Sequence, residues 1–229
     1  IYLRMETTNE NSGAKKTPRN DYQTLQESVS QMKLAFTNAS MPGIYEVLLT
    51  VGYTQEKLNA MLAKVGVIEE RMLDKTKEDA DQVAEQEHFD LQKDSIHSTF
   101  ITHRSLAKVL LKNDVHASVS LQLNGNTPKA YTDWKDMISN FYTQIGNQPA
   151  LLAKTSTIGI TAAVATAQLG AIAGLEATKS TLKKETAEAQ AATQARDEAF
   201  DDIHPQYIEY IKFAKVLLAD SPLLKALGV

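Results

Sequence analysis

Apolar residues recur every three or four positions in two short segments, about Asp21–Asn38 and Lys129–Ile145. This spacing is typical of an amphipathic helix, so each segment is predicted to form one. A Pro-Gly pair follows the first segment and a Gly-Asn-Gln-Pro run follows the second. Both are helix-stopping sequences, which sets the ends of the two predicted helices.

A much longer helix is predicted after each short one. Thr54 and Thr161 follow Gly-Tyr and Gly-Ile, and both suit the N-cap position. From Thr54 to Leu111 there is no proline and a single glycine, so the helical pattern extends well beyond the usual length. The charged stretch 74–81 and His204-Pro205 are the two candidate positions for a break or kink.

Both long segments carry an apolar seam in alternating steps of three and four residues. Such a seam is the packing face of a helical bundle. In the first segment it consists of Phe89, Lys93, Ile96, Phe100, His103, Ala107 and Leu110, and in the second of Arg196, Phe200, Ile203, Tyr207, Tyr210, Ala214 and Leu217.

The two long segments are variants of one pattern. A shift of 107 residues aligns Val51–Leu111 with Ile158–Leu218 without a gap, and 19 of the 61 aligned positions are identical, against about 6% by chance. The run AKVLL occurs in both. The sequence therefore predicts an all-α fold: an elongated four-helix bundle that arose by tandem duplication of a helix-turn-long-helix unit, with one short strand-like connector.

The predicted organisation has four parts. Residues 1–20 form a polar arm, residues 21–112 the first helical repeat, residues 113–127 the connector and residues 128–229 the second repeat.

The connector is predicted as a strand because its apolar residues alternate strictly with polar ones before an Asn-Gly-Asn turn. It either lies on the bundle as an extended segment or pairs with a neighbouring subunit. In the second case the subunit interface consists of Val115, Val119, Leu121 and Leu123.

The composition of the chain excludes some classes of function. The chain carries a net charge of -4 and no basic block, which argues against nucleic acid as a partner. The absence of cysteine excludes disulfides, thiol chemistry and cysteine metal sites. No signal peptide is recognisable, so a cytoplasmic and an exported protein are both compatible with the sequence. Because the chain begins with Ile1, either Met5 is the natural start or an upstream segment was removed.

One polar pattern, Asp-x-x-x-Asp-x-x-His, occurs in both long segments and could hold a metal. Its spacing puts each set on one helix face, and bundles that bind iron or manganese use carboxylate and histidine ligands from several helices. The predicted ligands are Asp94, His97, Asp201 and His204, preceded by Asp90 and Asp197, with Asp21 or Glu27 and Asp133 or Asp136 as partners from the short helices. The alternative is a polar stripe of local hydrogen bonds without a cofactor.

Other chemistry has little support in the sequence. Neither a phosphate-binding glycine loop nor a serine nucleophile motif occurs, so no catalytic residues and no small-molecule substrate are predicted. His103 lies on the seam and is predicted to be a buried histidine satisfied by one partner.

Residues 155–175 form an uncharged stretch rich in alanine, glycine and threonine. Its length would allow a membrane span, and Gly170 and Gly174 could permit close helix packing or membrane contact. Few large apolar side chains are present to drive insertion. A small-residue helix packed against neighbours is the favoured interpretation, and conditional membrane insertion or burial between subunits is the alternative.

The last hundred residues resemble a group of uncharacterised bacterial helical-bundle proteins. The resemblance rests on Gln190, Thr193, Arg196 and Asp197 in the second long segment, on the ending SPLLKALGV, and on DWKDMISNFY followed by GIT. It implies a helical bundle and no established activity.

These patterns together favour a non-enzymatic structural or self-assembling protein in which the arm and the connector mediate contacts between copies. A carboxylate/histidine metal-binding bundle and a membrane-engaging protein of pore-forming type are the two alternatives.

Overall fold

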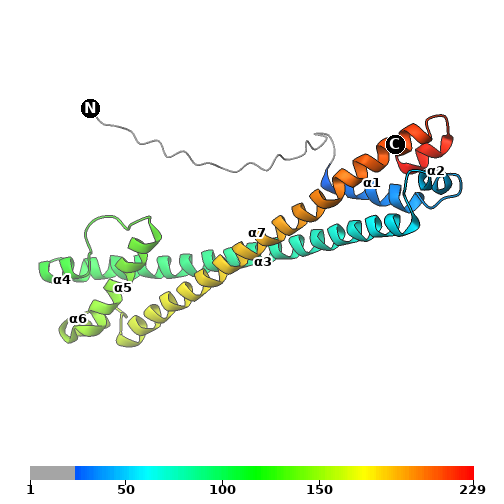
Figure 1. Ribbon diagram of the computed structural model, residues 1–229. Coiled ribbons are helices and arrows are strands. Elements are labelled where there is room, and N and C mark those ends of the chain that lie inside the picture. The colour runs from blue at the N-terminus through cyan, green and yellow to red at the C-terminus, as the bar shows by residue number, and fades with distance from the viewer. Residues whose placement is uncertain (1–23) are drawn as a thin grey trace, which may run out of the picture. The chain divides into compact units, whose positions relative to one another are not determined.

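The computed structural model describes residues 24–229, and the predicted polar arm lies outside the described residues. Within this range all regular structure is helical (Figure 1), which confirms the all-α prediction. The elements are α1 (Leu25–Asn38), α2 (Tyr45–Leu49), α3 (Gln55–Leu110), α4 (Val115–Ser120), α5 (Tyr131–Asn147), α6 (Pro149–Ser156), α7 (Ala162–Leu217) and the 3-10 helix η1 (Pro222–Leu227).

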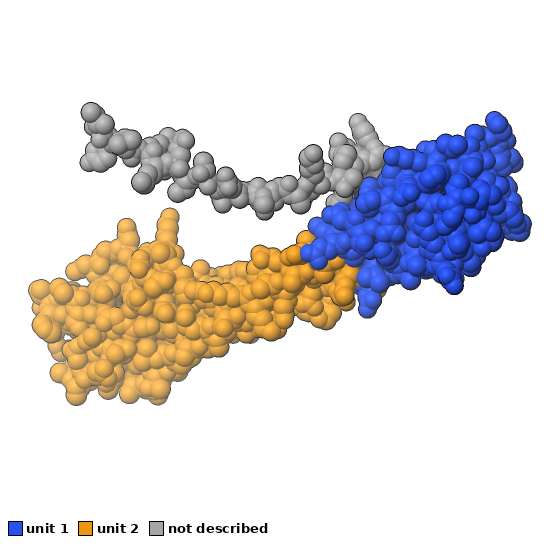
Figure 2. Space-filling view, viewed as in Figure 1, with its two compact units in different colours: residues 1–70, 197–229 blue, residues 71–196 orange. Residues whose placement is uncertain are grey.

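The described chain divides into two compact units (Figure 2). Unit 1 contains α1, α2, the first part of α3, the last part of α7, and η1. Unit 2, residues 71–196, contains the rest of α3 and α7 together with α4, α5 and α6. Each unit therefore draws its helices from both of the predicted repeats.

An aromatic cluster forms the core of unit 1. Phe36 of α1 packs edge-on against Tyr210 and Tyr207 of α7, with ring centroids 5.3 and 5.9 Å apart. Tyr53, which precedes α3, packs against Tyr210 at 5.2 Å. Edge-to-face pairs of this kind add to the stabilisation from burial alone. The Tyr210 hydroxyl donates a hydrogen bond to the carbonyl of Ala35 at 3.3 Å, so this buried oxygen has a partner.

The core of unit 2 is also aromatic. Phe100 of α3 packs edge-on against Phe141 of α5 with ring centroids 5.4 Å apart, and both side chains are fully buried. Tyr142 packs against Phe141 at 5.1 Å, and its hydroxyl shares a hydrogen bond of 2.9 Å with Nδ1 of His103. The predicted role of His103, a histidine satisfied by one partner, is confirmed, although its ring is only half-buried.

The two long helices correspond to each other in length and position. Both α3 and α7 have 56 residues, and their first and last residues lie 107 positions apart. The same shift relates α4 to η1, which have six residues each.

The N-caps of the long helices are the predicted threonines. The side-chain oxygen of Thr54 accepts a hydrogen bond from the backbone N–H of Lys57 at 3.2 Å, and that of Thr161 accepts one from Val164 at 3.3 Å. Each N-cap satisfies a backbone donor that the first helical turn leaves without a partner.

The strand predicted within residues 113–127 is wrong, because residues 115–120 form α4. Asp114 caps this helix by accepting a hydrogen bond from the backbone N–H of Ala117 at 3.0 Å. Val115 and Val119, one turn apart, are 76% and 68% exposed. Leu121 and Leu123 follow the helix and are buried in the core of unit 2. The alternation in the sequence therefore marks a short capped helix and the buried turn after it.

Neither long helix breaks at the positions considered for a break or kink. Residues 74–81 stay helical, and α7 continues through Pro205. Pro205 has no N–H to donate to the carbonyl one turn earlier. The side chain of Gln206 donates a hydrogen bond of 2.9 Å to the carbonyl of Asp202, which supports the same turn.

The predicted seam is largely buried, with a correction at its end. Phe100, Ala107 and Tyr210 are inaccessible to solvent. Leu110, however, is 37% exposed, and the next residue, Leu111, is buried in its place. The seam shifts by one position where the helix ends and the chain turns.

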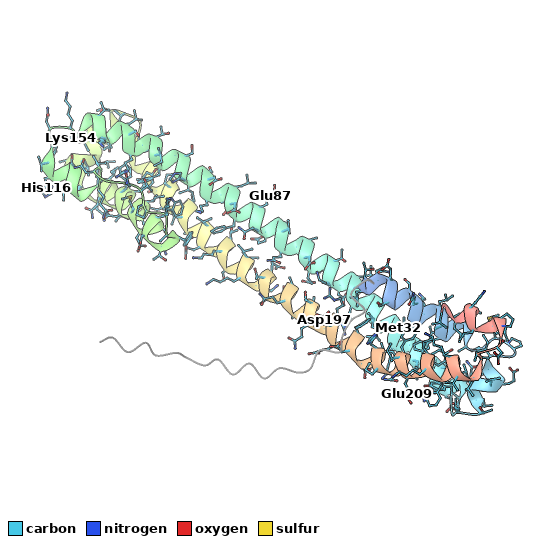
Figure 3. All side chains as sticks on the ribbon, turned by 90° about the horizontal axis from the view of Figure 1, so that it is seen from above. Met32, Glu87, His116, Lys154, Asp197 and Glu209 are labelled. Carbon is cyan, nitrogen blue, oxygen red and sulfur yellow. The ribbon has the colours of Figure 1, made fainter. Side chains whose placement is uncertain are left out.

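The middle of the two long helices differs from their ends. We call residues 71–88 of α3 and 179–196 of α7, all in unit 2, the stem. No side chain of 71–88 is buried, and Ala189 is the only one buried in 179–196. Around Glu87 no third helix of the described chain lies beside these two (Figure 3). Because burial of apolar surface is the main stabilising contribution, the stem holds its helices together more weakly than either core does.

Two glycines in loops of unit 1 give a matched test of backbone strain. Gly43 and Gly52 both have φ of +84°, in the left-handed region, where an alanine costs about 1–2 kcal/mol. A Cβ atom at Gly43 would also lie 2.9 Å from Cδ1 of Leu223, whereas one at Gly52 would meet no atom within 4 Å. We therefore expect Gly43→Ala to destabilise the protein by roughly 1 kcal/mol more than Gly52→Ala in urea unfolding. Equal losses would show that Leu223 moves aside without cost.

Candidate functional site

The best-defined polar contact near a predicted site residue lies in unit 2, between α3 and the start of α5. The indole N–H of Trp134 donates a hydrogen bond of 3.0 Å to Nδ1 of His97. Trp134 is 3% exposed, so this bond satisfies a buried donor. His97 and Asp94 line an open cleft of about 390 Å³, which is completed by Lys93, Ile101, Thr127, Pro128, Lys129 and Trp134.

This hydrogen bond does not suit metal binding by His97. A neutral imidazole has one nitrogen that accepts and one that carries the proton. Because Nδ1 accepts from Trp134, the proton of the neutral ring is on Nε2. Neither nitrogen then offers a free lone pair to a metal ion, whereas metal-ligating histidines normally donate from their second nitrogen.

The second predicted pair, Asp201 and His204, belongs to unit 1. The His204 ring stacks on Phe200 with centroids 4.9 Å apart and planes 21° from parallel. His204 borders a cleft of about 340 Å³ that also reaches buried core residues. The side chains and backbone lining it are Ser28, Gln31, Met32, Phe200, His204, Tyr207, Ile208, Ile211, Lys215, Gly228 and Val229.

The predicted iron or manganese site therefore gains no support from this geometry, since its two Asp–His pairs belong to different units. Among residues 24–229, the three side chains that come close enough to share an ion are Glu78, Glu185 and Glu188, with one oxygen of each within 4.8 Å of the others. Metal binding stays a prediction.

Two lysines of the stem neutralise these carboxylates. Lys77 lies 2.9 Å from Glu78 and 3.3 Å from Asp81, and Lys184 lies 2.8 Å from Glu188 and 3.4 Å from Glu185. Hydrogen bonding to Glu78 and then Asp81 raises the pKa of Lys77 to about 12. The two lysines are exposed, while Glu78 and Glu185 are half-buried. Each single ion pair of this kind adds little stability at a surface.

A second polar group of unit 2 surrounds Tyr131. Its hydroxyl donates a hydrogen bond to Glu176, and the ammonium of Lys179 lies 3.5 Å from the centre of its ring. The hydrogen bond from Tyr131 holds the pKa of Glu176 below its usual value. Burial, followed by this carboxylate, raises the pKa of Tyr131. These residues join α5 to α7 beside Trp134, whose ring lies 5.8 Å from that of Tyr131.

The other predicted contact residues differ in their exposure to solvent. Val115 and Val119 are exposed and accessible to a partner, but Leu121 and Leu123 are inside unit 2. At Gly170 and Gly174 of α7 an added Cβ would meet no atom within 4 Å, so the described chain places no neighbour in close contact there. Among residues 24–229, no helix has both the length and the apolar character needed to cross a membrane.

Acidification gives a test of the His103 environment. Burial lowers the pKa of His103 below its ordinary value of 6.5, so the folded protein favours the neutral ring. The stabilising contribution is complete above that value and is lost as the pH falls toward the folded pKa. We expect the urea midpoint, followed by Trp134 fluorescence, to fall between about pH 7.5 and 5.5. The His103→Tyr variant, which takes the residue found at position 210, should fall less; an equal fall would assign the effect to other groups.

The chain matches no protein-family model, no curated protein and no solved structure. The resemblance to bacterial helical-bundle proteins stays a prediction.

Sequence reasoning missed Trp134 as a site residue. It placed His97 and the segment that contains Trp134 on two different predicted helices, and nothing in the sequence showed that the two side chains meet. The sole tryptophan of the chain at the start of an amphipathic helix was the available signal.

Proposed function

We propose that this chain is a non-enzymatic structural protein, a tandemly duplicated helical scaffold that self-associates through exposed apolar side chains. In this proposal the two short helices α1 and α5 and the two long helices α3 and α7 are the four bundle elements. The helices α2, α4 and α6 lie in the connections between them, and η1 follows α7. The shared 107-residue spacing of α3 with α7 and of α4 with η1 supports the duplication.

One observation carries the proposed self-association: the same positions of α3 and α7 expose apolar side chains. Val109 is 75% exposed and Val216, its equivalent after the 107-residue shift, is 77% exposed. Two further equivalent pairs are partly exposed, Ile101 with Ile208 and Leu106 with Phe213. Single exposed apolar residues are ordinary. Val109 and Val216 belong to the AKVLL run that both segments share, and retention of exposed apolar residues at matched positions favours a shared purpose.

A second copy of the chain is the partner that fits this arrangement best. Each copy has two similar surfaces, one in each unit. Pairing of like surfaces would give a closed dimer, and pairing of the α3 surface with the α7 surface of the next copy would give an open chain of subunits. Val115 and Val119 of α4 add exposed apolar area to unit 2.

Light scattering of the purified protein tests the proposal. We expect the wild-type protein to have at least twice the mass of a single chain, which is 25.2 kDa. The double variant Val109→Lys/Val216→Lys should shift that mass toward a single chain, because charges at an apolar contact oppose association. The matched control is Gln86→Lys/Thr181→Lys, which adds the same two charges at exposed positions of the same two helices, away from the apolar pairs. A wild-type monomer at all concentrations contradicts the proposal.

A further inference from the structure

The cleft of unit 1 and the cleft of unit 2 occupy equivalent places. A shift of 107 residues superposes His97 on His204 and Ile101 on Ile208, and each of these residues lines the cleft of its own unit. The helix opposite each pair is α1 or α5.

The short helices α1 and α5 correspond with a shift of 106 residues. Phe36 packs against Tyr210 in unit 1, and Tyr142 packs against His103 in unit 2. Both rings are buried, and the two residues lie equally far from the first residue of their helices. The same shift pairs Ser28 of α1 with Trp134 of α5. These two residues line the equivalent clefts, so the correspondence extends to the site itself.

The two clefts differ at this position, and they also differ in Thr127, Pro128 and Lys129, which line only the cleft of unit 2, and in Gly228 and Val229, which line only that of unit 1. In unit 2 the buried indole of Trp134 belongs to the core, donates a hydrogen bond to His97 and lines the cleft. Phe100 and Arg104, which correspond to Tyr207 and Ile211, do not line that cleft. In unit 1 the equivalent position holds the smaller side chain of Ser28, and Tyr207 and Ile211 line the cleft.

The cleft of unit 1 has an apolar floor. Met32 of α1 (Figure 3), Tyr207 and Ile211 are buried core residues that nevertheless line the cleft. Phe200, stacked on His204, forms a further aromatic wall. The polar residues around this floor are Ser28, Gln31, His204 and Lys215, and the backbone of Gly228 and Val229 completes the lining.

We propose that the cleft of unit 1 binds a small aromatic carboxylate whose flat ring takes the place that the Trp134 indole has in unit 2. The apolar floor accepts the ring, and Lys215 attracts the carboxylate. The volume of about 340 Å³ is in the range of small-molecule sites, which combine apolar walls with a few polar groups. The inference rests on the correspondence between the repeats in the proposed function. It does not depend on self-association.

Calorimetric titration of the full chain with indole-3-acetate tests the proposal. We expect one saturable site per chain. Ser28→Trp, which introduces the residue of the equivalent position, should weaken binding by at least about tenfold, while Ser28→Ala should bind as the wild type does. Circular dichroism establishes that each variant keeps its helices.

Two further measurements separate the ring from the charge. Lys215→Gln should reduce the preference for indole-3-acetate over neutral indole while indole binding is retained. Trp134→Ser should create a second site in unit 2. The proposal is overturned if the wild type shows no saturable binding, if Ser28→Trp binds with unchanged affinity, or if folded Trp134→Ser still binds a single ligand. Light scattering of the same samples reports self-association independently.

Discussion

Replacing Phe100 with alanine should lower the free energy of unfolding of unit 2 by about 3–5 kcal/mol, as large-to-small changes in a buried core do. Phe100 has no exposed surface and packs edge-on against Phe141 at 5.4 Å. Alanine would remove this aromatic pair and leave a cavity between α3 and α5. Because the chain has one tryptophan, Trp134 in unit 2, its fluorescence during urea unfolding reports the loss directly.

Leu91→Ala is the matched control for that experiment. Leu91 lies on the same helix but is 65% exposed, so its truncation should change stability by less than about 1 kcal/mol. If Phe100→Ala were as mild as Leu91→Ala, the aromatic pair could not be central to the core of unit 2.

Phe36→Ala should have a similar effect on unit 1, about 3–5 kcal/mol, and this loss should hardly appear in Trp134 fluorescence. Phe36 is 2% exposed and packs against Tyr207 and Tyr210. The stem has almost no buried side chains, so little energy couples the unfolding of one unit to that of the other. Circular dichroism should then show a transition at lower urea concentration that fluorescence does not follow.

Tyr210→Phe is the matched control in unit 1. It keeps the ring and removes the hydroxyl that donates to the carbonyl of Ala35, which should cost about 0.5–1.5 kcal/mol. If Phe36→Ala moved the fluorescence and dichroism midpoints together, the two units would unfold as one and the stem would be stronger than its burial indicates.

Much of the helical framework could be predicted from sequence because local signals mark it. Thr54 and Thr161 cap the long helices as expected, and each follows a glycine with positive φ. A capping threonine and a left-handed glycine are properties of a few adjacent residues, which a sequence displays directly.

The connector was misassigned because two patterns coincide there. Val115, Val119 and Leu121 satisfy strand alternation, but Val115 and Val119 also lie one helical turn apart. Asp114, a helix cap, was the signal that distinguishes them. The burial of Leu121 depends on contacts with distant parts of unit 2, and no local pattern carries that information.

The cleft of unit 1 could not be predicted from the sequence, for a different reason. Its equivalence to the Trp134 site depends on a 106-residue shift between α1 and α5, whereas α3 and α7 follow a 107-residue shift. Ser28 and Trp134 therefore do not align in the ungapped comparison. The sequence also could not show that the Asp–His pairs belong to different units.

The way each unit draws on both halves of the chain has a consequence for its ancestry. Phe36 of the first half packs against Tyr210 of the second, and Phe100 of the first packs against Phe141 of the second. One half alone has only part of each core. If the chain arose by duplication, its single-length ancestor needed a second molecule to complete those cores and was an obligate homodimer. The two halves produced as separate polypeptides should then recover the fold only when mixed.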